Sequence, residues 1–231
     1  MSSPTRYDKG VTNVDRSSTM GMFLAPDPTK VHVFFDDFDF YNSTDGETWD
    51  IVAASGSVAL ADGDGGRILL TTNAADNALA QIATVAECFK LEAGKKAWFK
   101  AKVAAMAGAT QQDVIIGLHV DDQTPVAGAP ADGVYFRKDD GDTNWDFQIM
   151  KSSASVGADT AIATATTGEI TLGFYFDGVS KFDFYVDDVL TGSVTTTDFP
   201  TTELGVAITV QAGNSSAATL TMDYVLAAKE R

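Results

Sequence analysis

The 231-residue chain has 16 lysine and arginine residues against 32 aspartate and glutamate residues, which gives a formal net charge of −16 at pH 7. This charge disfavours unassisted binding to duplex nucleic acid or to an anionic membrane surface. The single cysteine, Cys88, excludes an intrachain disulfide and a cysteine-based metal site. We therefore expect neutral or basic partners, no nucleic acid and no membrane.

Residues 1–30 differ from the rest of the chain because they lack a hydrophobic period and hold three of the six prolines, as expected of an extended arm. Four basic and three acidic residues give this arm a net charge of +1, which leaves −17 for residues 31–231. Its apolar side chains are poor residues to leave in water, so the arm docks either on its own body or on a partner. The predicted partner contacts are Arg6, Tyr7, Lys9, Arg16, Met20, Met22, Phe23 and Leu24.

From Val31 to the end, short apolar runs with a period of two are separated by clusters of Gly, Asp, Asn and Ser. This pattern predicts an all-β, two-sheet antiparallel sandwich. The Ala-rich segment 74–91 also fits a helix, but its short, uncapped apolar spacing favours a strand. The expected strands are 31–41, 50–60, 67–72, 79–89, 96–106, 113–121, 133–138, 145–151, 170–177, 180–187, 190–195, 204–211 and 217–228.

Aromatic strand pairs between residues 132 and 188 are expected to form the core and to set its register. A type I′ turn at Asp177-Gly178 is predicted to join two of these strands, because aspartate and glycine tolerate the positive φ angles that it requires. The alternation in 204–211 and in 217–228 predicts half-buried strands, with Tyr224 on the apolar side. The predicted core phenylalanines are Phe136, Phe147, Phe174, Phe176, Phe182 and Phe184.

The strand at 96–106 is expected to place Phe99 inward and Trp98 outward among lysines. Trp98 could pack under a loop or make a local cation–π contact, which would be a structural role. The alternative is an interface or a sugar-stacking residue. We keep Trp98 and Lys100 as candidate contact residues on the outer face.

Side chains arranged for catalysis are not evident in the sequence. A hydrolase on a sandwich would need two nearby carboxylates on one strand face, and the chain has no Glu-x-Asp-x-x-Glu run. His32 and His119 lie in separate strand runs, and no serine nucleophile elbow is present. These observations predict that the chain has no catalytic residues and is not an enzyme.

Two Asp-rich turns carry enough oxygen atoms to coordinate Ca²⁺. They are Asp62-Gly-Asp64 and the segment 139–144, which reads Asp-Asp-Gly-Asp-Thr-Asn. Neither fits the EF-hand spacing, and the usual preference of aspartate and glycine for tight turns explains both. We predict no metal site and no cofactor, with Ca²⁺ kept as the alternative.

Four segments, in chain order, resemble virion proteins of tailed bacteriophages that carry a concanavalin-like (laminin G-like) domain. They are 35–38, 96–103, 132–141 and 222–231. The resemblance implies a jelly-roll β-sandwich over residues 31–231, preceded by the arm at 1–30, with the first and last long strands near each other. The calcium and sugar residues of plant lectins have no match, so carbohydrate binding is not carried over from them.

Three hypotheses on function follow. The leading one is a non-enzymatic capsid decoration (cement) protein on the virion surface, assembled in the host cytoplasm, which binds the major capsid protein through its arm and self-associates as a homotrimer. The second is a carbohydrate-binding or host-attachment module, suggested by the fold and by Trp98. The third is a polysaccharide-cleaving enzyme on the same scaffold.

Overall fold

The computed structural model describes residues 29–42, 47–51 and 55–231. The described residues divide into two units, one that contains residues 29–32 together with Arg231, and a body from Val33 to Glu230. In the first unit, the amide of Arg231 donates a hydrogen bond to the carbonyl oxygen of Lys30 at 2.9 Å. The boundary expected after residue 30 stays a prediction, and the body is described on its own.

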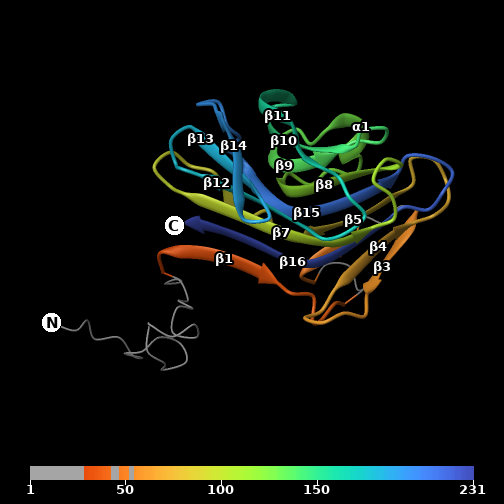
Figure 1. Cartoon of the computed structure of the whole chain (residues 1–231). Helices are drawn as coiled ribbons and strands as arrows, with labels where there is room; N and C mark the ends of the chain where they lie inside the picture. The colour runs from red at the N-terminus through yellow and green to blue at the C-terminus, as the bar shows by residue number, and fades with distance from the viewer. Residues whose placement is uncertain (1–28, 43–46, 52–54) are drawn as a thin grey trace. The chain divides into compact units, whose positions relative to one another are not determined.

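Two eight-stranded antiparallel sheets form the two layers seen in Figure 1. Sheet A has the order β14 (Val189–Thr195), β13 (Lys181–Val186), β12 (Ile170–Phe176), β7 (Ala97–Met106), β16 (Thr219–Glu230), β4 (Ile68–Thr72) and β3 (Gly56–Leu60), and β1 (Val31–Asp36) pairs with β16. Sheet B has the order β11 (Ala154–Thr164), β10 (Asn144–Lys151), β9 (Gly133–Lys138), β8 (Gln112–His119), β15 (Glu203–Ala212), β5 (Leu79–Thr84) and β2 (Trp49–Ile51), and β6 (Phe89–Lys90) pairs with β15. The predicted all-β, two-sheet sandwich is confirmed.

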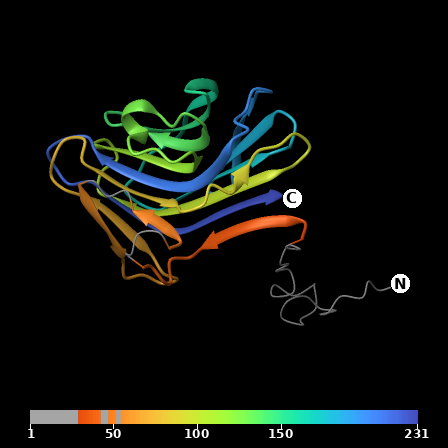
Figure 2. The same ribbon diagram turned by 180° about the vertical axis from the view of Figure 1, so that it is seen from behind.

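The view from behind in Figure 2 shows the same two layers, with the long strand β15 above β16. The described part of the chain also contains a four-residue helix, α1 (Pro125–Gly128). No helix in that part is long and apolar enough to cross a membrane.

The core between the sheets is rich in phenylalanine, as the alternation predicts. All six predicted core phenylalanines are at most 2% exposed. The ring of Phe147, on sheet B, lies 5.8 Å from that of Phe174 and 5.1 Å from that of Phe184, both on sheet A. Phe174 also stacks on Phe99 of the adjacent strand at 5.4 Å. These contacts join the two layers and fix the register within sheet A.

Two-residue turns with two positive φ angles lie at Asp187-Asp188, between β13 and β14, where φ is 49° and 64°, and at Ser152-Ser153, between β10 and β11, where φ is 51° and 65°. The prediction of a type I′ turn at Asp177-Gly178 is wrong, because β12 ends at Phe176 and β13 begins at Lys181, which leaves a four-residue loop. Only Gly178 in that loop has a positive φ, of 82°. Three backbone amides bind the Asp177 carboxylate there, which stabilises the longer connection.

Strand β11 is missing from the sequence prediction. Its residues are mostly small, and six of the eleven are exposed, because it is the edge strand of sheet B and contributes little to the core. The ambiguous segment 74–91 contains β5 and β6, so the choice of strand over helix is confirmed. The strand expected over 50–60 corresponds to β2 and β3, and residues 52–54 between them lie outside the described residues.

Two predictions about strand faces are wrong. The register of β16 against β7 shifts between Thr221 and Tyr224, so Val225 rather than Tyr224 continues the buried row. This bulge turns Tyr224 to the outer face. Strand β15 is buried on both faces from Leu204 to Ala212, because the outer side of sheet B is also covered.

Replacing Phe147 with alanine is expected to lower the free energy of unfolding by about 3–5 kcal/mol, because it removes a fully buried ring between the sheets. Chemical denaturation at neutral pH measures this change. The matched control is Phe40→Ala, which removes a ring that is 90% exposed and should change stability by no more than about 0.5 kcal/mol. Equal effects of the two substitutions would contradict the assigned core.

Candidate functional site

The outer face of sheet A carries a row of partly exposed aromatic side chains. On β7 and β12, Trp98 lies opposite Tyr175, while the adjacent Phe99 and Phe174 are buried in the core. Their burial forces Trp98 and Tyr175 to point away from the core. The two outer rings have centroids 5.7 Å apart and an interplanar angle of 36°, so they form a tilted pair with one side open to solvent.

Next to this pair, the sheet has no side chain at Gly173, which lies opposite Lys100 on one side and Tyr185 on the other. A depression of about 440 Å³ opens there, lined also by Trp98 and Tyr175. A Cβ atom at Gly173 would lie 3.1 Å from the carbonyl oxygen of Phe99 and 3.7 Å from Cγ of Lys100, within the space that the depression uses. Gly173 therefore forms its floor.

Charged side chains complete the lining. The Lys100 ammonium lies 2.6 Å from the Asp188 carboxylate. Burial alone lowers the pKa of Lys100, but the hydrogen bonds to Asp188 and Tyr224 raise it above its ordinary value. Lys100 is thus a fixed cation, held in place by the two-residue turn at Asp188 and by the bulge at Tyr224.

Lys96 is the second cation at the depression and directly precedes β7. Its side chain is exposed, and among the described residues no carboxylate oxygen lies within ion-pair distance of its ammonium group. Its backbone is fixed, because its amide donates to the Glu230 carboxylate at 2.9 Å and its carbonyl accepts from the Glu230 amide at 2.9 Å. The anchor of Lys96 is therefore rigid, while its ammonium group is free to reach a ligand.

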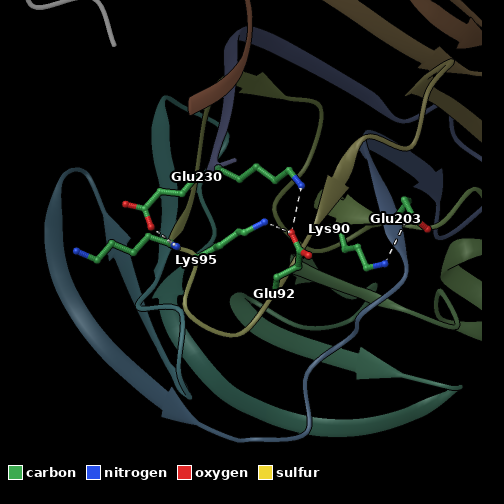
Figure 3. Close-up of polar contacts among 7 residues, drawn as sticks. Lys90, Glu92, Lys95, Glu203 and Glu230 are labelled. Carbon is green, nitrogen blue, oxygen red and sulfur yellow. Dashed lines mark hydrogen bonds and ion pairs between the residues drawn. The ribbon is translucent and has the colours of Figure 1, made fainter. Parts of the chain in front are cut away.

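A separate network of paired charges, none of which lines the depression, is shown in Figure 3. Glu92 accepts a hydrogen bond from Lys95 at 2.9 Å and lies 4.0 Å from Lys229, and Lys90 lies 3.4 Å from Glu203. These pairs are exposed and contribute little stability each.

The loop at Asp177 holds the strand end that carries Tyr175. The amide of Gly94, before β7, donates to the carbonyl oxygen of Gly178 at 2.6 Å, which joins this loop to the β7 end of the site. One carboxylate oxygen of Asp177 accepts from the amides of Val179, Ser180 and Lys181 at 2.7, 2.9 and 3.0 Å. Burial raises the pKa of Asp177, but these hydrogen bonds outweigh it and hold the pKa below its usual value.

Two of the predicted contact residues lie in the depression, and the others lie outside the described residues. Trp98 and Lys100 lie together in the depression, with the outward orientation that alternation predicts, while their role in binding stays a prediction. Gly173, Tyr175, Tyr185 and Asp188 belong to the same site and were missed, because only strand pairing brings them together. The predicted contacts of the arm, from Arg6 to Leu24, all lie outside the described residues.

Part of the outer face of sheet B is covered. Ile115, Tyr135 and Met150 form a small buried cluster there, covered by Val126 of α1 and by Ala129. Burial raises the pKa of Tyr135 to about 12. Gln81 and Thr209 lie side by side on adjacent strands of the same face, fully buried and without hydrogen-bond partners among the described residues.

Neither Asp-rich turn gathers ligands for a metal. Within residues 29–42, 47–51 and 55–231, no three His, Cys, Asp or Glu side chains come together as a group able to hold a metal ion. Asp139 pairs with Arg137, and Asp142 accepts hydrogen bonds from the backbone and side chain of Asn144 at 3.0 and 3.1 Å. The Ca²⁺ alternative stays a sequence prediction.

Comparison with known proteins finds no family model and no curated protein that matches the sequence. Solved structures do match in fold. An endo-1,3-beta-glucanase from Streptomyces sioyaensis has a TM-score of 0.63 and 16% identity, and the match covers 89% of this chain and 98% of that protein. A Bacillus licheniformis beta-glucanase has a TM-score of 0.59 and 13% identity over 84% and 97% of the two chains. Peanut lectin has a TM-score of 0.58 and 11% identity over 87% and 97%.

These matches show that the chain has the concanavalin-like jelly-roll fold found in lectins and glucanases. They correct the inference that the chain is not an enzyme, because glycoside hydrolases occur on the same scaffold. The absence of a Glu-x-Asp-x-x-Glu run excludes one arrangement of carboxylates and no more. None of the three structures is described as a virion protein.

The Asp177 loop should make part of the stability depend on pH. The pKa of Asp177 in the folded state is below the unfolded value of about 3.9. The loop therefore contributes fully to the free energy of unfolding above about pH 3.9, and the contribution is lost as the pH falls through the folded-state pKa. Asp177→Asn should flatten the acid limb of a plot of unfolding free energy against pH. Asp64→Asn, at an exposed turn residue, is the control, and an NMR titration that gave Asp177 an ordinary or raised pKa would contradict the assignment.

Proposed function

We propose that this protein binds carbohydrate in the depression on the outer face of sheet A. The observation that carries the proposal is the tilted Trp98–Tyr175 pair beside the bare floor at Gly173. The apolar C–H face of a pyranose ring packs against an aromatic ring, and its hydroxyl groups need hydrogen-bonding groups at the edge. Lys96, Lys100 and Asp188 supply such groups here.

Size and fold support the same proposal. The volume of about 440 Å³ falls within the usual range for small-ligand sites. Lectins and glucanases with the same fold are carbohydrate-active proteins by their descriptions, which makes saccharides the first ligand class to test. Fold alone does not decide function, so the proposal depends on the side chains named above.

Capsid decoration remains a proposal from the sequence alone. Its contacts lie in the arm outside the described residues, and no feature of the body from Val33 to Glu230 specifically favours a capsid partner or a trimer. The carbohydrate proposal is preferred because its site can be built from described residues.

Trp98→Ala and Tyr175→Ala are each expected to weaken saccharide binding by about tenfold or more, since each removes a stacking surface at the centre of the site. Calorimetry against a panel of β-glucan and galactoside oligosaccharides measures this loss. Phe40→Ala is the control, because it removes an exposed aromatic ring that does not line the depression.

The proposal fails if the unchanged protein binds no saccharide in the panel, or if Trp98→Ala binds as tightly as Phe40→Ala. Thermal unfolding of each variant shows whether the fold is retained. Reducing ends are measured in the same incubations, because glucanases share the fold, and their release would show that hydrolysis follows binding.

A further inference from the structure

We infer that the depression prefers acidic saccharides and that Lys96 is the residue that binds their carboxylate. The inference rests on the proposed carbohydrate binding and adds the chemical class of the ligand. Its basis is the charge of the lining, which contains two ammonium groups, Lys96 and Lys100, and one carboxylate, Asp188. The site is therefore locally cationic in a chain with a net charge of −16.

The two lysines are not equivalent. Lys100 is neutralised by Asp188 at 2.6 Å, so it can donate hydrogen bonds but supplies little net charge. Lys96 has no such partner among the described residues, and the adjacent Glu230 carboxylate is bound to its backbone amide. Lys96 is therefore the ammonium group of the lining that forms no ion pair among the described residues.

Other lysines near the site show that pairing is the rule in this part of the sheet. Lys102 lies 2.9 Å from Asp223 and 3.3 Å from Glu169, and Lys181 lies 2.8 Å from Asp183. Both are on the outer face of sheet A but outside the depression. Of the described lysines on the outer face of sheet A near the site, the one without a carboxylate partner is thus the one at the edge of the aromatic pair.

The position of Lys96 suits a charged substituent on a stacked sugar. Alternate residues of an extended strand point to the same side and lie about 6.5–7 Å apart, so Lys96 lies next to Trp98 along the chain. A lysine side chain is long enough to cover that interval. A pyranose on Trp98 with a carboxylate at C6 could then form an ion pair with Lys96 while its ring stays stacked.

The acidic surface does not prevent this interaction at physiological salt. The Debye length is about 8 Å at 0.15 M ionic strength, so distant carboxylates are largely screened and the charges within the depression dominate. A charge-assisted hydrogen bond between an ammonium group and a carboxylate is also stronger than one to a hydroxyl group. The lining should therefore distinguish a uronic acid from the corresponding neutral sugar.

The test compares two ligands that differ only in charge, a β-1,3-glucan hexamer and the same hexamer oxidised at C6 to the glucuronate. The unchanged full-length protein should bind the oxidised hexamer about three to ten times more tightly at 0.15 M salt. Lys96→Gln should make the protein bind the two hexamers equally, whatever its effect on the affinity for the neutral hexamer. Lys96→Arg should retain it, because guanidinium also binds carboxylate.

Lys151→Gln is the matched control. It makes the same change in net charge on β10 of sheet B, where Lys151 pairs with Asp198 at 2.5 Å. If this variant loses the preference as Lys96→Gln does, the overall charge rather than Lys96 causes it, and the inference is overturned. If the unchanged protein binds the two hexamers equally, or binds the neutral one more tightly, the inference is overturned, while the proposal of carbohydrate binding is retained. If the unchanged protein binds neither hexamer nor any saccharide of the panel, the proposed function fails together with the inference.

Discussion

The stacking of Phe99 on Phe174 is the contact on which the outer surface depends. The two rings face each other across β7 and β12 and are buried against sheet B, so they fix the register of these strands. Side chains alternate along a strand, and a slip by one residue would exchange the two faces. The position of Trp98 opposite Tyr175 is therefore a consequence of how the core packs.

The same constraint explains the shape of the site. Leu172 and Phe174 are buried, so the residue between them must face outward, and this residue is Gly173. A larger side chain at that position would fill the space beside Lys100. The depression thus forms because one outward position of β12 has no side chain. The aromatic rings that border it point outward because the core buries their neighbours.

Charge is distributed unevenly over this protein. The excess of aspartate mostly lies in turns, as at Asp177 and Asp187, where carboxylates accept hydrogen bonds from backbone amides. Lysines near the site are mostly neutralised by a nearby carboxylate. The site therefore has an electrostatic character of its own, which neither the net charge nor the isoelectric point describes.

The two outer faces of the sandwich differ in a way that matters for function. On sheet B, α1 and the residue after it cover an apolar cluster, and the buried side chains of Gln81 and Thr209 beside it have no hydrogen-bond partner within the described part of the chain. On sheet A the corresponding surface is open and carries the aromatic pair. Lectins and glucanases share the fold, so the chemistry of a given member has to be argued from the face that its own side chains leave accessible.

The sequence by itself determined the fold class, the phenylalanine core and the outward orientation of Trp98, because alternation with a period of two directly reports which side chains are buried. It could not reveal β11, whose only large apolar residues are Val156 and Ile162, or the bulge that turns Tyr224 outward. Nor could it assemble the site, since Lys96, Gly173 and Asp188 are far apart in the chain. Only tertiary structure decided their proximity, because strand order and register arise from long-range packing that no local pattern encodes.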